Sequence, residues 1–322
     1  MKRMWRIAGA MALASGLAAC EPIEIDDGGG GGGGGNVLFT KGFVFLREDR
    51  NVYVVDDRGD ANSPKRLTTG GGALHPAVSA NGRSVVYVQQ TGTSFELRTV
   101  PTDASTQPST VFASGGTVCS RCTNFRFPTF NPAGNVIVFA FNHGSDNFSL
   151  GRVNSDGSNF QQLTNNPALS YGAPSFFPDG QSVLTPAGNT SSDLRLLERV
   201  TLTGTSTSVT NNLGNEVQAV ITRAVVSPDG RQVALDGRLG SGGTRIFVGG
   251  LNPFTSPTQI TDHPGEPGAQ DSFPSWVGST QVGFLSNAGG TQSIYRVSLG
   301  SSTLGPGTLL VPTASEPSYG GT

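Results

Sequence analysis

Residues that catalyse reactions, bind metals or form disulfides are scarce in this chain. Its 322 residues include three cysteines and three histidines, and charged residues make up 14%. Beyond Cys20 no segment has a convincing helical period of apolar residues. Positive charge is not in excess, because the formal net charge is −2. This balance gives neither the electrostatic footprint of a DNA- or RNA-binding protein nor a polybasic attraction to anionic lipid, so we exclude nucleic acid as a partner.

Glycine and proline, by contrast, are abundant, with 46 and 20 residues. Turn formers at this density suit many short strands, so the composition favours an all-β architecture. The chain is also too long for one small domain.

The first 19 residues have the order of an export signal. Lys2, Arg3 and Arg6 precede a small apolar run at residues 7–19, which is too short to span a bilayer. The run ends in Leu17-Ala18-Ala19-Cys20, which resembles the bacterial lipobox. This resemblance implies cleavage before Cys20 and a lipid on its thiol, and the acyl chains then supply the membrane affinity. The alternative is an ordinary secretory signal followed by a chance cysteine.

A flexible tether is expected at residues 20–36. It contains the unbroken glycine tract of residues 28–35, and glycine combines maximal backbone freedom with no side chain to bury. The tract is no phosphate-binding loop, because neither Lys-Ser/Thr nor a strand–loop–helix context surrounds it. Without residues 1–19 the chain keeps 18 basic and 23 acidic residues, a net charge of −5.

One pattern recurs through residues 37–322. Its clearest copies begin at Pro174 and Ala224 and continue through a short strand into Pro-Asp-Gly, and further copies begin at residues 76, 128, 274 and 317. A period of 40–50 residues is the signature of propeller blades. In the Pro-Asp-Gly turn, Pro fixes φ, Asp bonds its own backbone and Gly accepts a positive φ.

The segments between the turns predict four strands in each repeat. A Pro-X-aromatic inner strand is followed by a nearly continuous apolar strand such as Val136-Ile137-Val138-Phe139, as expected for a strand covered on both faces. An alternating third strand such as Phe95 to Val100 comes next. A short fourth strand ends in Leu-Thr or Ile-Thr, as at Leu67-Thr68, Leu163-Thr164 and Ile260-Thr261.

The first and last segments complete each other. Residues 43–46, 51–55 and 66–68 supply strands two to four of a blade, and Pro317-Ser318-Tyr319 supplies strand one. The sequence therefore predicts an all-β, six-bladed β-propeller of four-stranded antiparallel blades, with the last blade closed by both chain termini. Such closure removes exposed sheet edges.

This string of Leu-Thr, Pro-X-aromatic, Ser-Pro-Asp-Gly, apolar strand and Ile-Tyr resembles the TolB-type propeller repeat, with its WD40-like Pro-Asp-Gly turns, over roughly residues 37–322. TolB is a soluble periplasmic protein with an additional N-terminal domain, whereas this chain has only the tether there. Its role in the Tol–Pal system therefore does not carry over. Similar repeats accompany hydrolase domains in prolyl-oligopeptidase-like enzymes, but this chain has no Gly-X-Ser-X-Gly elbow.

The sequence Cys119-Ser120-Arg121-Cys122 holds the remaining cysteine pair. Because the export signal implies an oxidising compartment, we expect a disulfide between Cys119 and Cys122. Thioredoxin-like chemistry would require a helix N-terminus, and a covalent haem would require His at the position of Thr123. A zinc site would require two more nearby ligands. We therefore predict no metal and no cofactor.

The three histidines are His75, His143 and His263. Some pectin lyases use a propeller of similar repeats with a histidine-lined metal site, and this resemblance singles out His75 and His263. Three ligands would have to converge, and the spacing does not force this, so isolated surface histidines are the favoured interpretation.

Aligning the repeats places six residues at one equivalent position, directly before the inner strands: His75, Phe127, Ala173, Arg223, Phe273 and Glu316. His75 could face the central channel, and Arg223 and Glu316 are the polar candidates if that end of the channel binds a ligand. The alternative is a solvated funnel rim, which is common for charged residues.

Together these features predict a cell-envelope lipoprotein, anchored to a bacterial membrane and facing the periplasm or the cell surface. Its propeller would act as a binding or scaffolding module for an envelope protein, peptide or glycan. One alternative is a propeller enzyme, a polysaccharide lyase or hydrolase acting at the channel mouth, although no catalytic residue set is recognisable. Another is a merely structural role in the envelope. Propellers host many unrelated activities, so the fold alone does not decide between these.

Overall fold

The computed structural model describes residues 38–144, 147–266, 268–300 and 304–321. The chain divides into two units, Met1–Gly35 and Asn36–Thr322. The predicted signal peptide of residues 1–19, the lipidation at Cys20 and most of the tether of residues 20–36 fall in the first unit. All three lie outside the described residues and stay predictions. Within the described ranges no helix has the length and apolar character needed to cross a bilayer.

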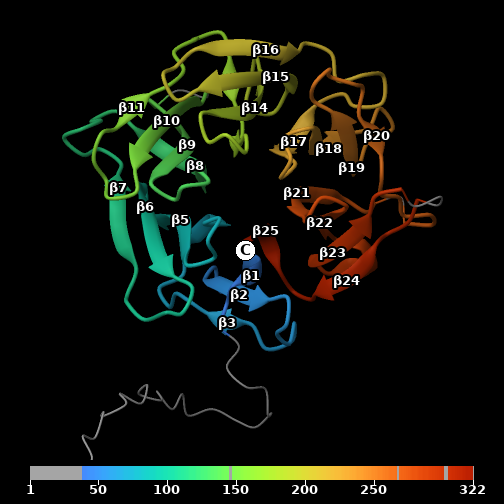
Figure 1. Ribbon diagram of the computed structural model, residues 1–322, viewed down its shortest axis with the longest axis horizontal. Helices are drawn as coiled ribbons and strands as arrows, with labels where there is room; N and C mark the ends of the chain where they lie inside the picture. Colours follow the sequence, from blue (N-terminus) through green and yellow to red (C-terminus); the bar gives the residue numbers. More distant parts are fainter. Residues whose placement is uncertain (1–37, 145–146, 267, 301–303, 322) are drawn as a thin grey trace, which may run out of the picture. The chain divides into compact units, whose positions relative to one another are not determined.

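Strands dominate the second unit, and within its described part the one helical element is the single 3₁₀ turn η1 (Ala288–Gly290). The antiparallel sheets stand around a common centre like the blades of a propeller (Figure 1). Four of these sheets have four strands each. They consist of β25 (Ser315–Gly321), β1 (Lys41–Leu46), β2 (Val52–Asp56) and β3 (Lys65–Arg66); β4 (Ala73–Val78), β5 (Ser84–Thr91), β6 (Ser94–Pro101) and β7 (Ser109–Ala113); β8 (Thr123–Phe130), β9 (Val136–Asn142), β10 (Ser149–Asn154) and β11 (Gln161–Gln162); and β21 (Asp271–Val277), β22 (Gln281–Ser286), β23 (Ser293–Ser298) and β24 (Thr308–Val311).

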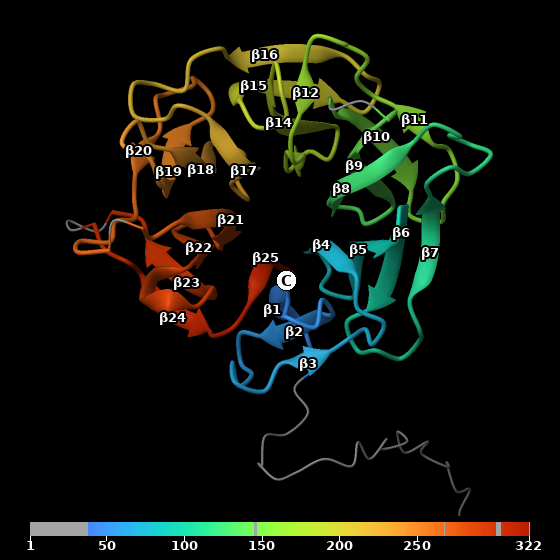
Figure 2. The same ribbon diagram turned by 180° about the vertical axis from the view of Figure 1, so that it is seen from behind.

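The remaining strands of the described chain form one nine-stranded sheet (Figure 2). Its members are β12 (Ser170–Tyr171), β13 (Ser175–Phe176), β14 (Ser182–Gly188), β15 (Leu194–Thr201), β16 (Ser206–Thr210), β17 (Val220–Val226), β18 (Gln232–Arg238), β19 (Thr244–Gly250) and β20 (Thr258–Gln259). The predicted all-β propeller fold is confirmed. Four blades stand as separate four-stranded sheets, which is fewer than the six predicted, because β15 and β17 pair and merge the rest.

The hydrophobic core lies between neighbouring sheets. One cluster combines Val44 and Val54 of the first sheet with Val85, Tyr87 and Val100 of the next. The second strand of each sheet is covered on both faces, and every residue of β9 and β14 is buried. The apolar runs that predict these strands are therefore explained by burial on two sides.

The last described strand pairs with the first, since β25 lies antiparallel to β1 with Tyr319 opposite Phe43. The two rings pack edge to face with centroids 4.9 Å apart, and the Tyr319 hydroxyl donates a hydrogen bond to Asp57. Residues 276 positions apart in the sequence thus share one sheet.

The buried carboxylate of Asp56 fixes the entry into β1. It accepts hydrogen bonds from the backbone N–H groups of Thr40 at 2.7 Å and Lys41 at 3.2 Å, and it pairs with Arg58 at 2.7 Å. Burial raises the pKa of Asp56, but the hydrogen bonds from Arg58 and from the backbone outweigh this effect and hold the pKa below its ordinary value.

The Pro-Asp-Gly turns work through side-chain hydrogen bonds. In the turn after β17, Asp229 accepts from the Ser227 hydroxyl at 2.6 Å and from the Arg231 N–H at 3.0 Å, while Gly230 has a φ of +74°. In the degenerate turn after β4, Asn81 replaces the aspartate and accepts the equivalent bonds at 2.7 and 3.0 Å. The turn therefore tolerates Asn for Asp because only an acceptor oxygen is needed.

The Leu-Thr pairs lie one step beyond the strands that they were expected to end. β3, β11 and β20 have two residues each and stop directly before Leu67, Leu163 and Ile260. The threonine hydroxyl that follows accepts a hydrogen bond from a buried backbone N–H of the third strand. The three bonds are Val52 to Thr68 at 2.9 Å, Leu150 to Thr164 at 2.8 Å and Ile246 to Thr261 at 3.1 Å. The motif thus continues the sheet with a side chain where the backbone ladder ends.

Candidate functional site

A cavity of about 550 Å³ lies at the centre of the sheets of the described chain. The inner strands β4, β8, β13, β17, β21 and β25 line it, and Figure 2 shows β4, β8, β17, β21 and β25 around the centre. Its walls are rich in proline and aromatic residues: Pro76, Pro128, Pro132, Pro174, Pro178, Pro228, Phe127, Phe130, Phe176, Phe177, Trp276 and Tyr319. A mostly apolar cavity of this size with a few polar groups is typical of a ligand site.

The residues predicted to lie directly before the inner strands are found within β4, β8, β17, β21 and β25 in five of the six repeats, and four of them have an unusual backbone. His75, Phe127, Phe273 and Glu316 have φ values of +50°, +50°, +54° and +48°, which non-glycine residues seldom adopt. The strand register shifts at the same places in β4, β8, β21 and β25. Such bulges re-aim a side chain, and repeated backbone strain of this kind is typical of functional positions.

Contacts join these equivalent positions, as the repeat alignment suggests. Nδ1 of His75 lies 3.0 Å from Oε2 of Glu316, which also accepts the His75 backbone N–H. The His75 ring packs on Phe127 with centroids 4.1 Å apart. Burial raises the pKa of Glu316, but the hydrogen bonds and charge of His75, with the charge of Arg223, outweigh this and lower it overall.

Arg223 is buried beside the cavity with only 9% of its surface exposed. The Arg223 guanidinium lies over the Phe273 ring, 4.8 Å from its centroid. The backbone of Arg223 forms a parallel β-bridge with Ala173 of the preceding repeat. Nε has no hydrogen-bond partner among the described residues. Burial lowers the pKa of Arg223 to about 10, although the charges of Asp236 and Glu316 oppose the shift.

Asp236 in β18 organises this region, although the repeat and turn patterns of the sequence do not single it out. The carboxylate is fully buried and accepts backbone N–H groups from Thr222 at 2.8 Å, Arg223 at 3.1 Å and Phe273 at 3.0 Å. It therefore fixes the bulge of β17 and connects it to β21. The available signal is an acid inside the apolar run Val233-Ala234-Leu235-Asp236, since buried acids seldom occur without partners.

His263 lies away from the cavity. Its Nε2 is 2.7 Å from Oδ1 of Asp271, whose Oδ2 accepts the Thr261 hydroxyl at 2.6 Å. The His263 and Asp271 side chains are 1% and 0% exposed. This buried pair anchors the connection between β20 and β21, so the structure does not bring His263 together with His75 at a shared metal position.

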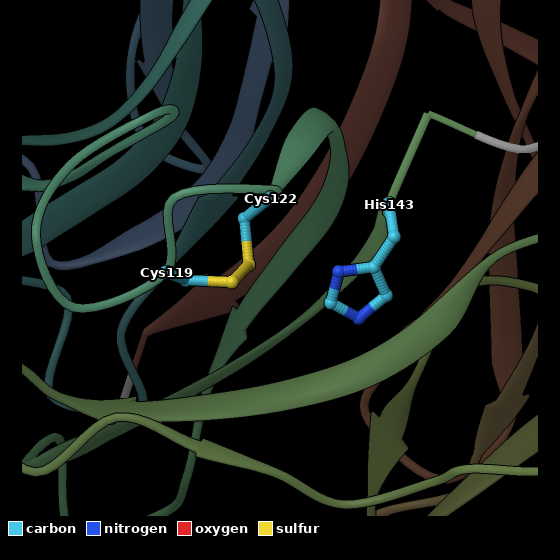
Figure 3. A group of neighbouring side chains, drawn as sticks. All are labelled: Cys119, Cys122 and His143. Atoms are coloured by element: carbon cyan, nitrogen blue, oxygen red, sulfur yellow. A yellow bond between two sulfur atoms is a disulfide. The ribbon is translucent and has the colours of Figure 1, made fainter.

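His143 lies beside the cysteine pair (Figure 3). Cys119 and Cys122 are disulfide-bonded with their Cα atoms 5.3 Å apart, and Cys122 is buried against the phenylalanine cluster of the second and third sheets. Potential ligand atoms of the two cysteines and His143 lie within 4.8 Å of one another. While the sulfurs are bonded to each other they offer no thiolate, so the disulfide form does not suit a metal ion.

The comparisons with known proteins point to the same architecture. No family model and no curated protein matches the sequence. Among solved structures, TolB from Acinetobacter baumannii is similar with a TM-score of 0.65 at 15% identity, over 87% of this chain and 66% of that chain. Putative TolB from Agrobacterium tumefaciens gives 0.54 at 16% identity, over 88% and 99%. An oligogalacturonate lyase from Vibrio parahaemolyticus gives 0.54 at 14% identity, over 81% and 75%.

The structural neighbours are therefore TolB-like β-propeller proteins and related propeller enzymes. At these identities the likeness shows the fold alone. The resemblance to TolB that the repeats indicate is confirmed at that level. The chain spans 66% of the length of Acinetobacter TolB, so that protein's activity and partners are not transferred.

Proposed function

We propose that this protein is a lipid-anchored envelope lipoprotein whose propeller binds a protein, peptide or glycan partner at the central cavity. The observation that carries the proposal is the cavity itself, which combines apolar walls with the recessed, unpaired Arg223. Preformed cavities with few convergent polar groups are the usual place for recognition.

The propeller of this proposal has six blades. In its support, the nine-stranded sheet has two halves, β12–β16 and β17–β20, that meet through one residue pair, Leu194 with Val220. Six inner strands, one from each repeat, line the cavity. The antiparallel pairing of β25 with β1 supports the view that both chain ends complete the last blade. A ring closed in this way presents no free inner edge for aggregation.

The membrane anchor of this proposal rests on the sequence of residues 1–20. The basic start, the short apolar run and the lipobox-like end support cleavage and lipidation at Cys20, and thereby an envelope location. A Cys20→Ala variant should leave the membrane fraction and enter the aqueous phase in detergent partitioning. Unchanged membrane retention would contradict the lipid anchor.

An enzymatic role is the second candidate, and one observation favours it. His75 and Glu316 lie 3.0 Å apart beside the cavity, a pairing that suits proton transfer. A propeller lyase or hydrolase would use this pair on a polysaccharide. Incubation with oligogalacturonate, followed by ultraviolet detection of unsaturated products, tests the lyase version. Activity that is lost in His75→Ala would favour it, and its absence would exclude that substrate.

In-cell crosslinking followed by pull-down and mass spectrometry tests the binding role. The matched variants are Ala80→Trp and Ala133→Trp. Both alanines are exposed in equivalent turns between the first two strands of a repeat, but only Ala80 lines the cavity. The proposal expects one defined envelope partner, which Ala80→Trp loses and Ala133→Trp retains. Recovery of bulk membrane protein alone, or an equal effect of both variants, would overturn it.

A further inference from the structure

The geometry points to a carboxylate-binding subsite at Arg223 in the cavity lining. We propose that Arg223 receives the free C-terminal carboxylate of an extended, apolar peptide that enters the cavity. This inference rests on the proposed binding function and adds the chemistry of the ligand. It assigns to Arg223 the role of the residue that orients the chain end.

The first argument is the unpaired charge of Arg223. A buried cation is costly unless an anion or hydrogen-bond acceptors compensate it. The guanidinium makes no ion pair within 4.0 Å with any carboxylate of the described residues, and Nε has no acceptor. Stacking on Phe273 at 4.8 Å orients the plane of the group. Because Nε is shielded, the two Nη groups of this cavity-lining residue would bind the two oxygens of a carboxylate, which arginine binds in a bidentate manner.

The neighbouring acids are already engaged, so they leave this charge available. The Asp236 carboxylate accepts four backbone N–H groups and the Thr222 hydroxyl. Glu316 is paired with His75, and it does not line the cavity. Lys41 adds a second positive charge to the lining, in which no aspartate or glutamate occurs among the described residues. The cavity therefore favours a negatively charged group.

The lining also indicates the body of the ligand. Sugars require many hydrogen-bonding side chains, yet the described lining contains no Asp, Glu, Asn or Gln. The indole N–H of Trp276 donates to the Val225 carbonyl at 3.0 Å, and the Tyr319 hydroxyl donates to Asp57. Both of these donors are therefore engaged by protein groups, so neither is free to donate a hydrogen bond to a sugar.

A ring of hydroxyls favours a peptide over a fatty acid. Four equivalent cavity-lining positions, one step after the prolines, are hydroxyl residues: Thr129, Ser175, Ser275 and Ser318. The Ser175 hydroxyl already accepts the Val226 N–H at 3.0 Å and keeps its own proton for donation. Hydroxyls can serve the N–H and C=O groups of a peptide backbone, which a hydrocarbon chain lacks. The lining thus combines a cation at Arg223, hydroxyls two residues further along the equivalent strands, and aromatic and proline residues around them.

Trp276 provides the measurement, because it lines the cavity and the only other tryptophan is Trp5 in the predicted signal. The purified lipidated protein in detergent is titrated with an N-acetylated tripeptide of alanine, phenylalanine and leucine, ending in a free acid or an amide. The proposal expects saturable change of Trp276 fluorescence with the acid, and binding roughly thirtyfold weaker or more for the amide. Equal affinity, or no binding of either peptide, would overturn it.

Variants of Arg223 test whether this residue causes the preference for the free acid over the amide. Arg223→Gln should abolish the difference between acid and amide, while Arg223→Lys should keep part of it if the Gln variant does not fold. Arg126→Gln is the matched control, because Arg126 also lies over a phenyl ring, at 4.3 Å from Phe148, but lines no part of the cavity. An acid preference that persists in folded Arg223→Gln or is absent in Arg126→Gln would contradict the assignment.

Two further outcomes separate this inference from the proposed function. Dodecanoate that binds where the free-acid peptide does not would overturn the peptide as ligand. A defined partner recovered from cells, together with no acid preference in the titration, would overturn the Arg223 subsite and leave the binding function standing. If no partner is captured in cells but the titration still shows the acid preference, the proposed binding function is overturned and the Arg223 subsite stands.

Discussion

Replacing Asp236 by asparagine should destabilise the protein strongly, although the two side chains have the same shape. Oδ1 of Asp236 accepts the Thr222 and Arg223 N–H groups, whereas Oδ2 accepts the Phe273 N–H at 3.0 Å. Asparagine keeps one oxygen and places an NH₂ donor where Oδ2 was. The Phe273 N–H would then face a donor and keep only its longer bond to the Thr222 hydroxyl at 3.2 Å, and that hydroxyl would lose Oδ2 as its own acceptor.

The size of the effect follows from these contacts. Two groups, the Phe273 N–H and the Thr222 hydroxyl, lose Oδ2 as an acceptor, and each loss costs roughly 1–2 kcal/mol. We therefore expect the free energy of unfolding to fall by about 3 kcal/mol. For a domain of this size the midpoint of thermal unfolding would fall by roughly 6–12 °C.

Urea denaturation of the purified variant measures this change, and hydrogen exchange localises it. Exchange should accelerate at the Phe273 amide and along β17. Asp229→Asn is the control, since Asn81 occupies the equivalent turn position and keeps its hydrogen bonds, so little change is expected. A loss below about 1 kcal/mol in Asp236→Asn would refute the view that this carboxylate connects β17 to β21.

Three further predictions concern stability. Thr164→Val removes the acceptor of the buried Leu150 N–H and should cost about 1–3 kcal/mol in urea denaturation. Gly283→Ala would place a Cβ 2.5 Å from Cζ of Phe43, so it should cost about 1–3 kcal/mol by overpacking the contact between β22 and β1, again by denaturation. Asp56 has a lowered pKa in the folded protein, so its stabilisation is complete above the unfolded-state pKa of about 4 and is lost as the pH falls below that value. The stability difference between wild type and Asp56→Asn should therefore be constant from pH 7 to about pH 5 and shrink below about pH 4.

Each of these predictions has a contradicting outcome. Thr203→Val, in an exposed turn, should be neutral, and an equal loss there would remove the special role of Thr164. A Gly283→Ala protein as stable as wild type would mean that β22 and β1 are not in close contact. A difference for Asp56→Asn that grows on acidification would reverse the sign expected from its hydrogen bonds.

The repeat made much of this fold predictable from the sequence. Turn chemistry at Asp229 and the apolar runs of β9 and β22 locate strands because local geometry and burial act within a few residues. The repeat spacing also places His75 and Glu316 at equivalent positions, 241 residues apart in the sequence, and the structure joins them.

Other features depend on contacts between repeats, which a pattern within one repeat does not contain. The buried role of Asp236 requires the amide of Phe273 from the next inner strand. The pairing of His263 with Asp271 requires the fold of a long connection, and sequence alone left His263 as a surface or metal-site candidate. The two-residue length of β11 follows from the Thr164 hydroxyl replacing a backbone partner, which the Leu-Thr pattern does not reveal.

In the proposed function the partner is bound at the mouth of the cavity. A photo-crosslinking amino acid at Ala80, which is exposed and lines the cavity, tests this in living cells against one at Thr207, which is exposed on β16 at the outer side of the ring. The account predicts a discrete adduct with the same partner protein or peptide from position 80 and none from position 207. An adduct from position 207 alone would contradict it and move the binding surface to the outer strands.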